Sequence, residues 1–142
     1  MDLNDIKQKG TALGPWAHMA TVRPDGRPDV TPVHPCWEGD TLWIMAGTRS
    51  VKARNIGSNA EVALHWQVTA VGDGLELWGT AVLHSDLDTK RRLWNGVFDY
   101  DLNQFSAGGP DGSPDVGFIA ITPTRALWLG AYGMSGTERW SA

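Results

Sequence analysis

The sequence predicts a mainly β protein, a small antiparallel barrel of six to seven strands with one short and one longer helix. Segments with alternating apolar residues recur along the chain, and two segments with helix-start signals interrupt them. The 17 glycines and 8 prolines make 25 of 142 residues, well above an average of about 12 per cent, as expected for many turns. At this length residues 1–142 form one domain.

The first half of the chain predicts a short helix followed by a β-meander. The helix is expected over about residues 2–9. Residues 18–22 and 30–34 are extended segments on either side of the turn sequence at 24–26, which is typical of a hairpin. Because Pro32 cannot donate a hydrogen bond to a ladder, we expect the second strand to lie at an edge or to carry a bulge.

The remaining elements follow from caps and alternation. Ser50 is a good N-cap for a helix over 51–56 with Gly57 at its C-terminus, and a longer helix is expected from Ser85. Gly79 is expected to mark a bulge, and the tail over 130–142 shows no periodicity. Further strands are expected at 41–45, 61–66, 75–83, 116–121 and 126–129.

Charge and hydropathy exclude several classes of protein. The net charge is −4 with no basic run, which argues against nucleic acid as a partner. No stretch of about eighteen apolar residues is present, so we expect no membrane span. The acidic start is unlike a secretory signal, and the single Cys36 suits a reducing compartment, so the sequence predicts a cytoplasmic protein.

Residues 48–54 are the first candidate site. Two hydroxyl side chains, three cations and the free N–H groups of a helix start fall within seven residues. This combination suits an anion, a phosphate above all, with Lys52 supplying charge. The alternative is an ordinary capped helix whose basic residues lie in water.

Other chemistry-bearing residues are scattered. The histidines, His18, His34, His65 and His84, are too widely spaced for local zinc ligation, so we expect no metal site. Cys36 is expected to be a buried structural thiol. There is no Gly-x-Ser-x-Gly elbow and no Walker-type loop, so catalytic residues stay unknown and hard chemistry would need a cofactor.

The eight tryptophans divide into two groups. Trp43, Trp66 and Trp78 lie within expected strands and are interpreted as barrel or interface packing. Trp128 and Trp140 are better placed to cover a ligand, although packing is the alternative for each.

Taken in order, these segments resemble the flavin-binding split-barrel family, which includes pyridoxamine 5′-phosphate oxidase and the flavin-binding general stress proteins. The resemblance covers about residues 14–130 and implies a split barrel that holds FMN. It is carried by residues 18–22, 24–28, 31–33, 41–45, 50–56, 59–64, 77–81, 94–115 and 121–126.

The resemblance also implies roles for individual residues and a homodimer with two cofactor sites at its interface. A strand would run along the edge of the isoalloxazine, a second strand end would touch the cofactor, and a helix start would take its phosphate. Val51 stands where the family has an arginine, so Arg49 or Arg54 would compensate. These implied cofactor-binding residues are His18, Met19, Ala20, Thr21, Met45, Ala46, Arg49, Ser50, Val51, Lys52 and Trp128.

One departure limits the expected function. Pyridoxamine 5′-phosphate oxidases resemble one another in a C-terminal Arg-x-His pair, which the ending 137–142 lacks, so vitamin B6 oxidation is not assigned. The resemblance implies an FMN-dependent oxidoreductase, with a nicotinamide or other small molecule as reaction partner. The alternatives are an F420-dependent reductase, a non-catalytic flavin-binding stress or sensor protein, and a tryptophan-lined barrel that stacks sugars or single-stranded nucleic acid. Which subunit would supply Trp128, Arg139 and Trp140 stays open.

Overall fold

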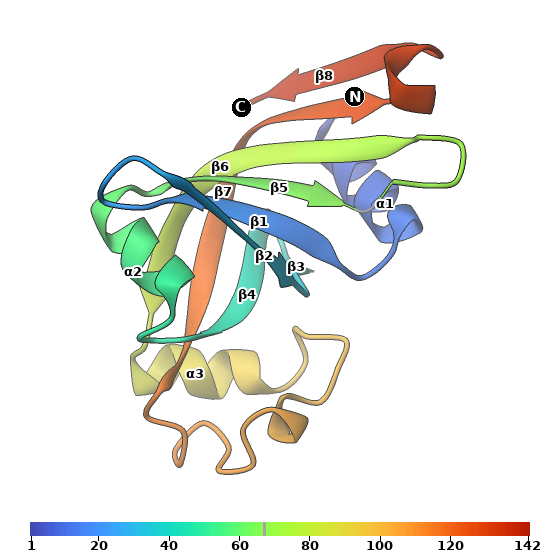
Figure 1. The fold of residues 1–142 in the computed structure, drawn as a ribbon. Helices are drawn as coiled ribbons and strands as arrows, with labels where there is room; N and C mark the ends of the chain where they lie inside the picture. Colours follow the sequence, from blue (N-terminus) through green and yellow to red (C-terminus); the bar gives the residue numbers. More distant parts are fainter. Residues whose placement is uncertain (67) are drawn as a thin grey trace.

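Antiparallel strands form a single sheet in the computed structural model, which describes residues 1–66 and 68–142 (Figure 1). Within these residues the sheet has eight strands in the order β2-β1-β5-β6-β7-β4-β3, with β8 paired to β7. This confirms the mainly β fold class. The elements are α1 (Leu3–Leu13), β1 (Ala17–Val22), β2 (Pro28–Val33), β3 (Cys36–Glu38), β4 (Thr41–Gly47), α2 (Val51–Ser58), β5 (Glu61–Trp66), β6 (Gly74–His84), α3 (Leu87–Trp94), the 3₁₀ turn η1 (Leu102–Gln104), β7 (Val116–Leu129), the 3₁₀ turn η2 (Ala131–Gly133) and β8 (Thr137–Ser141).

The long strand β7 organises the sheet. It pairs with β6 along most of its length, while β4 pairs with its first half and β8 with its second half. The prediction of two strands at 116–121 and 126–129 was therefore wrong. The register of β6 against β7 shifts between the two halves. Trp78 pairs with Arg125 and Gly79 pairs with Pro123, so Thr124 has no register partner on β6. This confirms the bulge expected at Gly79, where the sheet tolerates a proline.

Short edge strands account for the other differences from the sequence prediction. β2 lies at one end of the sheet, as Pro32 predicted, and the three-residue β3 lies at the other. The tail was predicted to be irregular, but its residues 137–141 form β8. Most β8 side chains are exposed, so the strand depends on hydrogen bonds to β7 and leaves no apolar alternation in the sequence.

Capping side chains mark the starts of α2 and α3, the first at the predicted Ser50 and the second at Asp86, next to the start expected at Ser85. Ser50 Oγ accepts a hydrogen bond from the Ala53 N–H at 3.3 Å, and the Asp86 carboxylate caps α3 in the same way. Two helix ends differ from expectation. Gly57 does not end α2, which continues to Ser58, and α1 runs past residue 9 because the buried Gly10 lets it pack against Trp66.

Two apolar cores hold the sheet and helices together. The larger cluster fills the barrel, and the smaller one lies where α3 covers the sheet at one end of the molecule (Figure 1). Val97 and Phe98 follow the end of α3 and pack on the smaller cluster from the loop. Among residues 1–66 and 68–142, no helix is long and apolar enough to cross a bilayer.

Candidate functional site

A cleft of about 470 Å³ opens beside the first turn of α2. Its walls come from the end of β2, the end of β4, the first turn of α2 and the loop after α3. Apolar and aromatic side chains dominate the lining, with a few polar groups, which is the usual character of a small-molecule site. The lining residues are Trp16, Pro32, Val33, His34, Met45, Ala46, Gly47, Lys52, Tyr100, Phe105 and Val116.

The start of α2 presents free backbone N–H groups at the edge of this cleft. Ser50 N donates to Gly47 O, and Ser50 Oγ is already used by the Ala53 N–H. The N–H groups of Val51 and Lys52 have no acceptor among the described residues. Because free N–H groups and the positive end of the helix dipole attract negative charge, an anion here would be stabilised.

Of the cations around α2, Lys52 is the one that lines the cleft. Arg49 is largely exposed and pairs with Asp115, its Nη2 lying 3.4 Å from Oδ1. Arg54 is exposed and lies outside the lining. The structure therefore brings Lys52 together with Met45 and Ala46, three of the residues that the resemblance implied.

The predicted residues of β1 lie elsewhere. Met19 is buried in the barrel core, and Thr21 Oγ1 accepts a hydrogen bond of 3.0 Å from the buried Asn55 Nδ2. His18 and Ala20 face the opposite side of the sheet, in a separate hollow of about 250 Å³. None of the four lines the cleft within one chain, so their contact with a cofactor stays a prediction.

Trp128 is also remote from the cleft. It packs against the main core, and Lys9 Nζ lies 4.5 Å from the centre of its ring. Lys9 in turn pairs with Glu138 on β8 at 3.2 Å. These contacts account for Trp128 as a residue that joins α1 to the end of β7, and a role in ligand binding stays a prediction.

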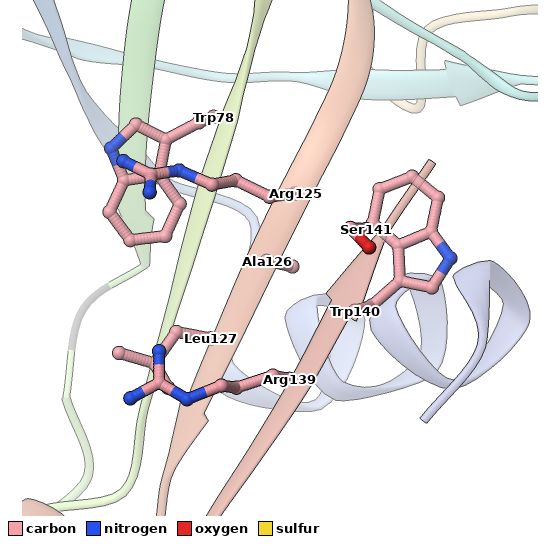
Figure 2. A pocket seen from close by; sticks show the side chains of 7 residues that line it. All are labelled: Trp78, Arg125, Ala126, Leu127, Arg139, Trp140 and Ser141. Atoms are coloured by element: carbon pink, nitrogen blue, oxygen red, sulfur yellow. The ribbon is translucent and has the colours of Figure 1, made fainter.

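A second hollow, of about 290 Å³, lies over β6, β7 and β8 (Figure 2). The Arg125 guanidinium stacks over Trp78 at 4.1 Å, and Arg139 projects from β8 nearby. Trp140, the neighbour of Arg139, lies on the other face of β8 and packs against the main core. This hollow is a cationic surface that lacks the apolar depth of the cleft.

The loop between α3 and β7 supplies the aromatic wall of the cleft. Tyr100 lies against the His34 ring, with ring centres 4.3 Å apart, and also contacts Phe105. Burial raises the pKa of the Tyr100 phenol to about 12, so the ring is neutral at physiological pH. Phe105 and Trp16 are 71% and 60% exposed at the mouth of the cleft.

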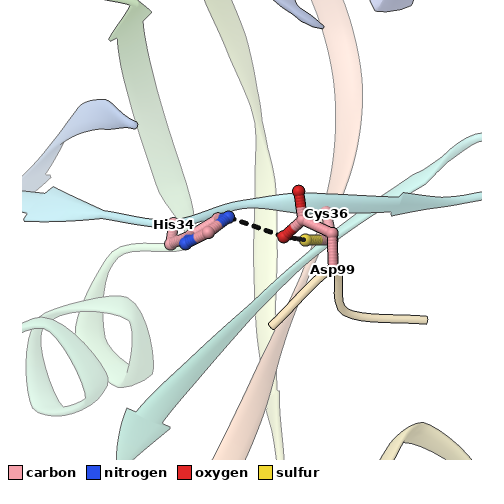
Figure 3. A group of neighbouring side chains, drawn as sticks. All are labelled: His34, Cys36 and Asp99. Atoms are coloured by element: carbon pink, nitrogen blue, oxygen red, sulfur yellow. Dashed lines mark hydrogen bonds and ion pairs between the residues drawn. The ribbon is translucent and has the colours of Figure 1, made fainter. Parts of the chain in front are cut away.

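Three polar side chains that the sequence did not group meet beside the cleft (Figure 3). His34 Nε2 lies 2.7 Å from Asp99 Oδ1, and Cys36 Sγ donates a 3.4 Å hydrogen bond to the same oxygen. Burial raises the pKa of the Cys36 thiol to about 11. The His-x-Cys spacing was the available signal, but Asp99 is brought to it only by the fold.

Comparison with known proteins agrees with this fold. The sequence profile described as pyridoxamine 5′-phosphate oxidase matches residues 15–129. No protein of curated function has a sequence that matches the chain.

Solved structures show the same architecture. A Clostridium acetobutylicum protein related to general stress protein 26, of the pyridoxinephosphate oxidase family, superposes with a TM-score of 0.79 at 16% identity, covering 99% of this chain and 96% of that one. A pyridoxamine 5′-phosphate oxidase-related, FMN-binding protein from Nostoc punctiforme gives 0.72 at 18% identity, covering 97% and 86%. A structure named F420 reductase gives 0.59 at 29% identity, covering 78% and 87%.

The fold is that of a split-barrel protein, and its cleft lies beside α2. The match of the family profile over residues 15–129 identifies the family: the chain belongs to the pyridoxamine 5′-phosphate oxidase family.

Proposed function

We propose that this protein binds FMN in the cleft and acts as a flavin-dependent oxidoreductase. The observation that carries the proposal is the pairing of an anion site with an apolar cleft. Lys52 and the free N–H groups at the start of α2 would hold the phosphate. Val33, Met45 and Ala46 offer apolar surface for a planar ring, beside the aromatic wall of Tyr100.

The residues of the cleft fit such a group in size and chemistry. A volume of about 470 Å³ lies within the usual range for small-molecule sites. When bound, FMN would supply hydride and electron transfer. The protein's own part would be to position the ring, exclude water with apolar side chains and place polar groups such as His34 at its edge. The substrate is an unidentified small acceptor, with a nicotinamide as a candidate electron donor.

Two copies of the chain would complete the site. The mouth of the cleft exposes Trp16 and Phe105, and His18 and Ala20 lie on the other side of the sheet. In a homodimer these β1 residues could contact a cofactor that the partner holds. This arrangement reconciles the implied role of β1 with its distance from the cleft in one chain.

F420 is a second candidate cofactor. The structure named F420 reductase is 29% identical over 78% of this chain. An F420 molecule would place its own phosphate and acidic tail near Lys52. Nothing in the lining of the cleft favours FMN over F420, so affinity must decide between them.

The first experiment is to record the absorbance spectrum of the purified protein and titrate it with FMN, riboflavin and F420. Lys52→Ala is expected to weaken FMN binding about ten- to a hundredfold, the worth of a hydrogen bond to a charged group. Riboflavin lacks the phosphate, so its affinity should change little. Arg54→Ala, on the same helix but outside the cleft, is the matched control.

The outcomes separate the candidates. A protein that takes up neither FMN nor F420 contradicts the proposal, and equal loss of FMN and riboflavin on Lys52→Ala contradicts the phosphate role. Flavin binding without oxidation of NADH or NADPH by any acceptor would favour the non-catalytic stress or sensor protein.

A further inference from the structure

We propose that His34, Cys36 and Asp99 form a binding site for a divalent metal ion of the zinc class. One nitrogen, one sulfur and one oxygen converge, all within 4.8 Å of one another. Figure 3 shows the three side chains pointing toward a common point. The site is separate from the proposed phosphate site and requires neither flavin nor turnover.

The fold arranges these groups in advance. His34 follows β2 and Cys36 begins β3, and Pro35 between them restricts the backbone. The imidazole packs against two aromatic rings, with ring centres 4.3 Å away for Tyr100 and 6.4 Å away for Trp16. Asp99 arrives from the loop after α3 and touches both partners.

The Nε2 atom of His34 is the observation in the cluster that indicates a ligand. His34 Nε2 is buried, and its 2.7 Å approach to Asp99 Oδ1 is not aligned as a hydrogen bond, so this nitrogen has no hydrogen-bond partner among the described residues. A buried polar atom without a partner is costly and rare. A metal ion between the nitrogen and the carboxylate would satisfy both.

The donor set matches zinc. Imidazole nitrogen, thiolate sulfur and carboxylate oxygen are its three common protein ligands, and a fourth position is left for water or substrate. Asp99 and Pro35 also line a hollow of about 230 Å³, through which that fourth ligand could enter. On binding, a zinc–sulfur bond replaces the S–H bond of Cys36, and the proton leaves to solvent.

The test uses the full-length protein with Zn²⁺ and Co²⁺ as probes. Calorimetry in two buffers of different ionisation enthalpy should show one Zn²⁺ per chain, with proton release that Cys36→Ser reduces by about one. Co²⁺ should give a thiolate charge-transfer band and the visible bands of a tetrahedral ion. Cys36→Ser should abolish the charge-transfer band.

The variants distinguish a built site from weak surface binding. His34→Ala, Cys36→Ser and Asp99→Asn should each weaken Zn²⁺ more than the roughly ten- to hundredfold typical of outer-shell changes. His84→Ala and Asp88→Asn alter a partly exposed histidine and an exposed carboxylate elsewhere, and should leave the Zn²⁺ affinity unchanged.

Two results would overturn the proposal. One is wild-type protein that shows no thiolate–cobalt band. The other is zinc affinity that Cys36→Ser leaves unchanged in a variant with native circular dichroism. If Cys36→Ser fails to fold, the wild-type cobalt spectrum and the zinc affinity of Asp99→Asn test the proposal instead. Asp99 is an exposed loop residue, so Asp99→Asn is expected to fold.

Discussion

Single side chains in this protein take their roles from what surrounds them. Lys52 and Arg54 lie two positions apart on α2, yet Lys52 lines the cleft and Arg54 faces solvent. Similarly, His18 lies in β1 and His34 follows β2, but of the two only His34 meets a carboxylate and a thiol. The type of a residue therefore indicates which chemistry it can perform, and its position in the fold decides whether it lies at a site where that chemistry is possible.

At this scale Asp86 gives a pH-dependent prediction. The Thr89 N–H, which donates to its carboxylate, lowers the pKa of Asp86 below its ordinary value of 3.8. The folded-state pKa is lower than the unfolded one, so the contribution is present above about pH 4 and lost as pH falls through the lowered pKa. Asp86→Asn keeps a capping side chain that cannot titrate, so it should flatten this part of the stability profile.

Urea unfolding between pH 7 and pH 3 is the measurement for Asp86. Asp88→Asn, on the exposed first turn of the same helix, is the control. If the free energy of unfolding depends on pH identically in Asp86→Asn and in the parent protein, titration of Asp86 does not contribute to the acid dependence of stability.

At the scale of elements, the bulge between β6 and β7 lets one long strand serve two neighbours. Gly79 has no Cβ, and an added one would lie 2.6 Å from Thr122 O and 2.8 Å from Ile121 Cγ2. Pro123 stands opposite it, where no ladder hydrogen bond is needed. Together these residues bend the sheet so that β4 and β8 share one edge of β7.

Gly79→Ala should therefore destabilise the protein by about 1–3 kcal/mol, the cost of overpacking against rigid backbone. Gly57→Ala is a matched comparison, since Gly57 lies inside α2 with open space around it. That change should stabilise by about 0.5–1 kcal/mol, because alanine favours helix. Chemical denaturation of both variants gives the two values, and a Gly79→Ala variant as stable as the parent would contradict the close approach.

At the scale of the whole molecule, exposed apolar side chains support the proposed homodimer. Val30 is 62% exposed and lines the hollow that contains His18, Ala20 and Trp78. Trp16 and Phe105 are further exposed aromatic side chains, at the mouth of the cleft. Exposed apolar surface is typical of an interface between subunits.

We expect a homodimer in sedimentation experiments at micromolar concentration. Val30→Glu should weaken the dimer at least about tenfold, because burying an unpaired carboxylate costs several kcal/mol, and FMN affinity should fall with it. Val71→Glu changes an equally exposed valine in the β5–β6 turn and should leave both unchanged. A monomeric parent protein that binds FMN with full affinity would rule out a shared site.

Sequence by itself determined the fold class, the hairpin, the helix cap at Ser50 and the bulge at Gly79. These features depend on local chemistry: alternation, missing donors and capping oxygens leave a signature within a few residues. The unbroken β7, the strand β8 and the end of α2 were missed, because hydrogen bonds and packing from distant residues override weak local signals.

Only the tertiary structure decided which residues share a site. The cleft joins the ends of β2 and β4 to α2 and to a loop some fifty residues further on, and the metal-binding cluster joins Cys36 to Asp99. Sequence motifs with a fixed spacing cannot relate residues so far apart in the chain, because these contacts form only when the sheet closes around its core. Residues 48–54 were visible in advance because a helix start places its donors, hydroxyls and cations together within one turn.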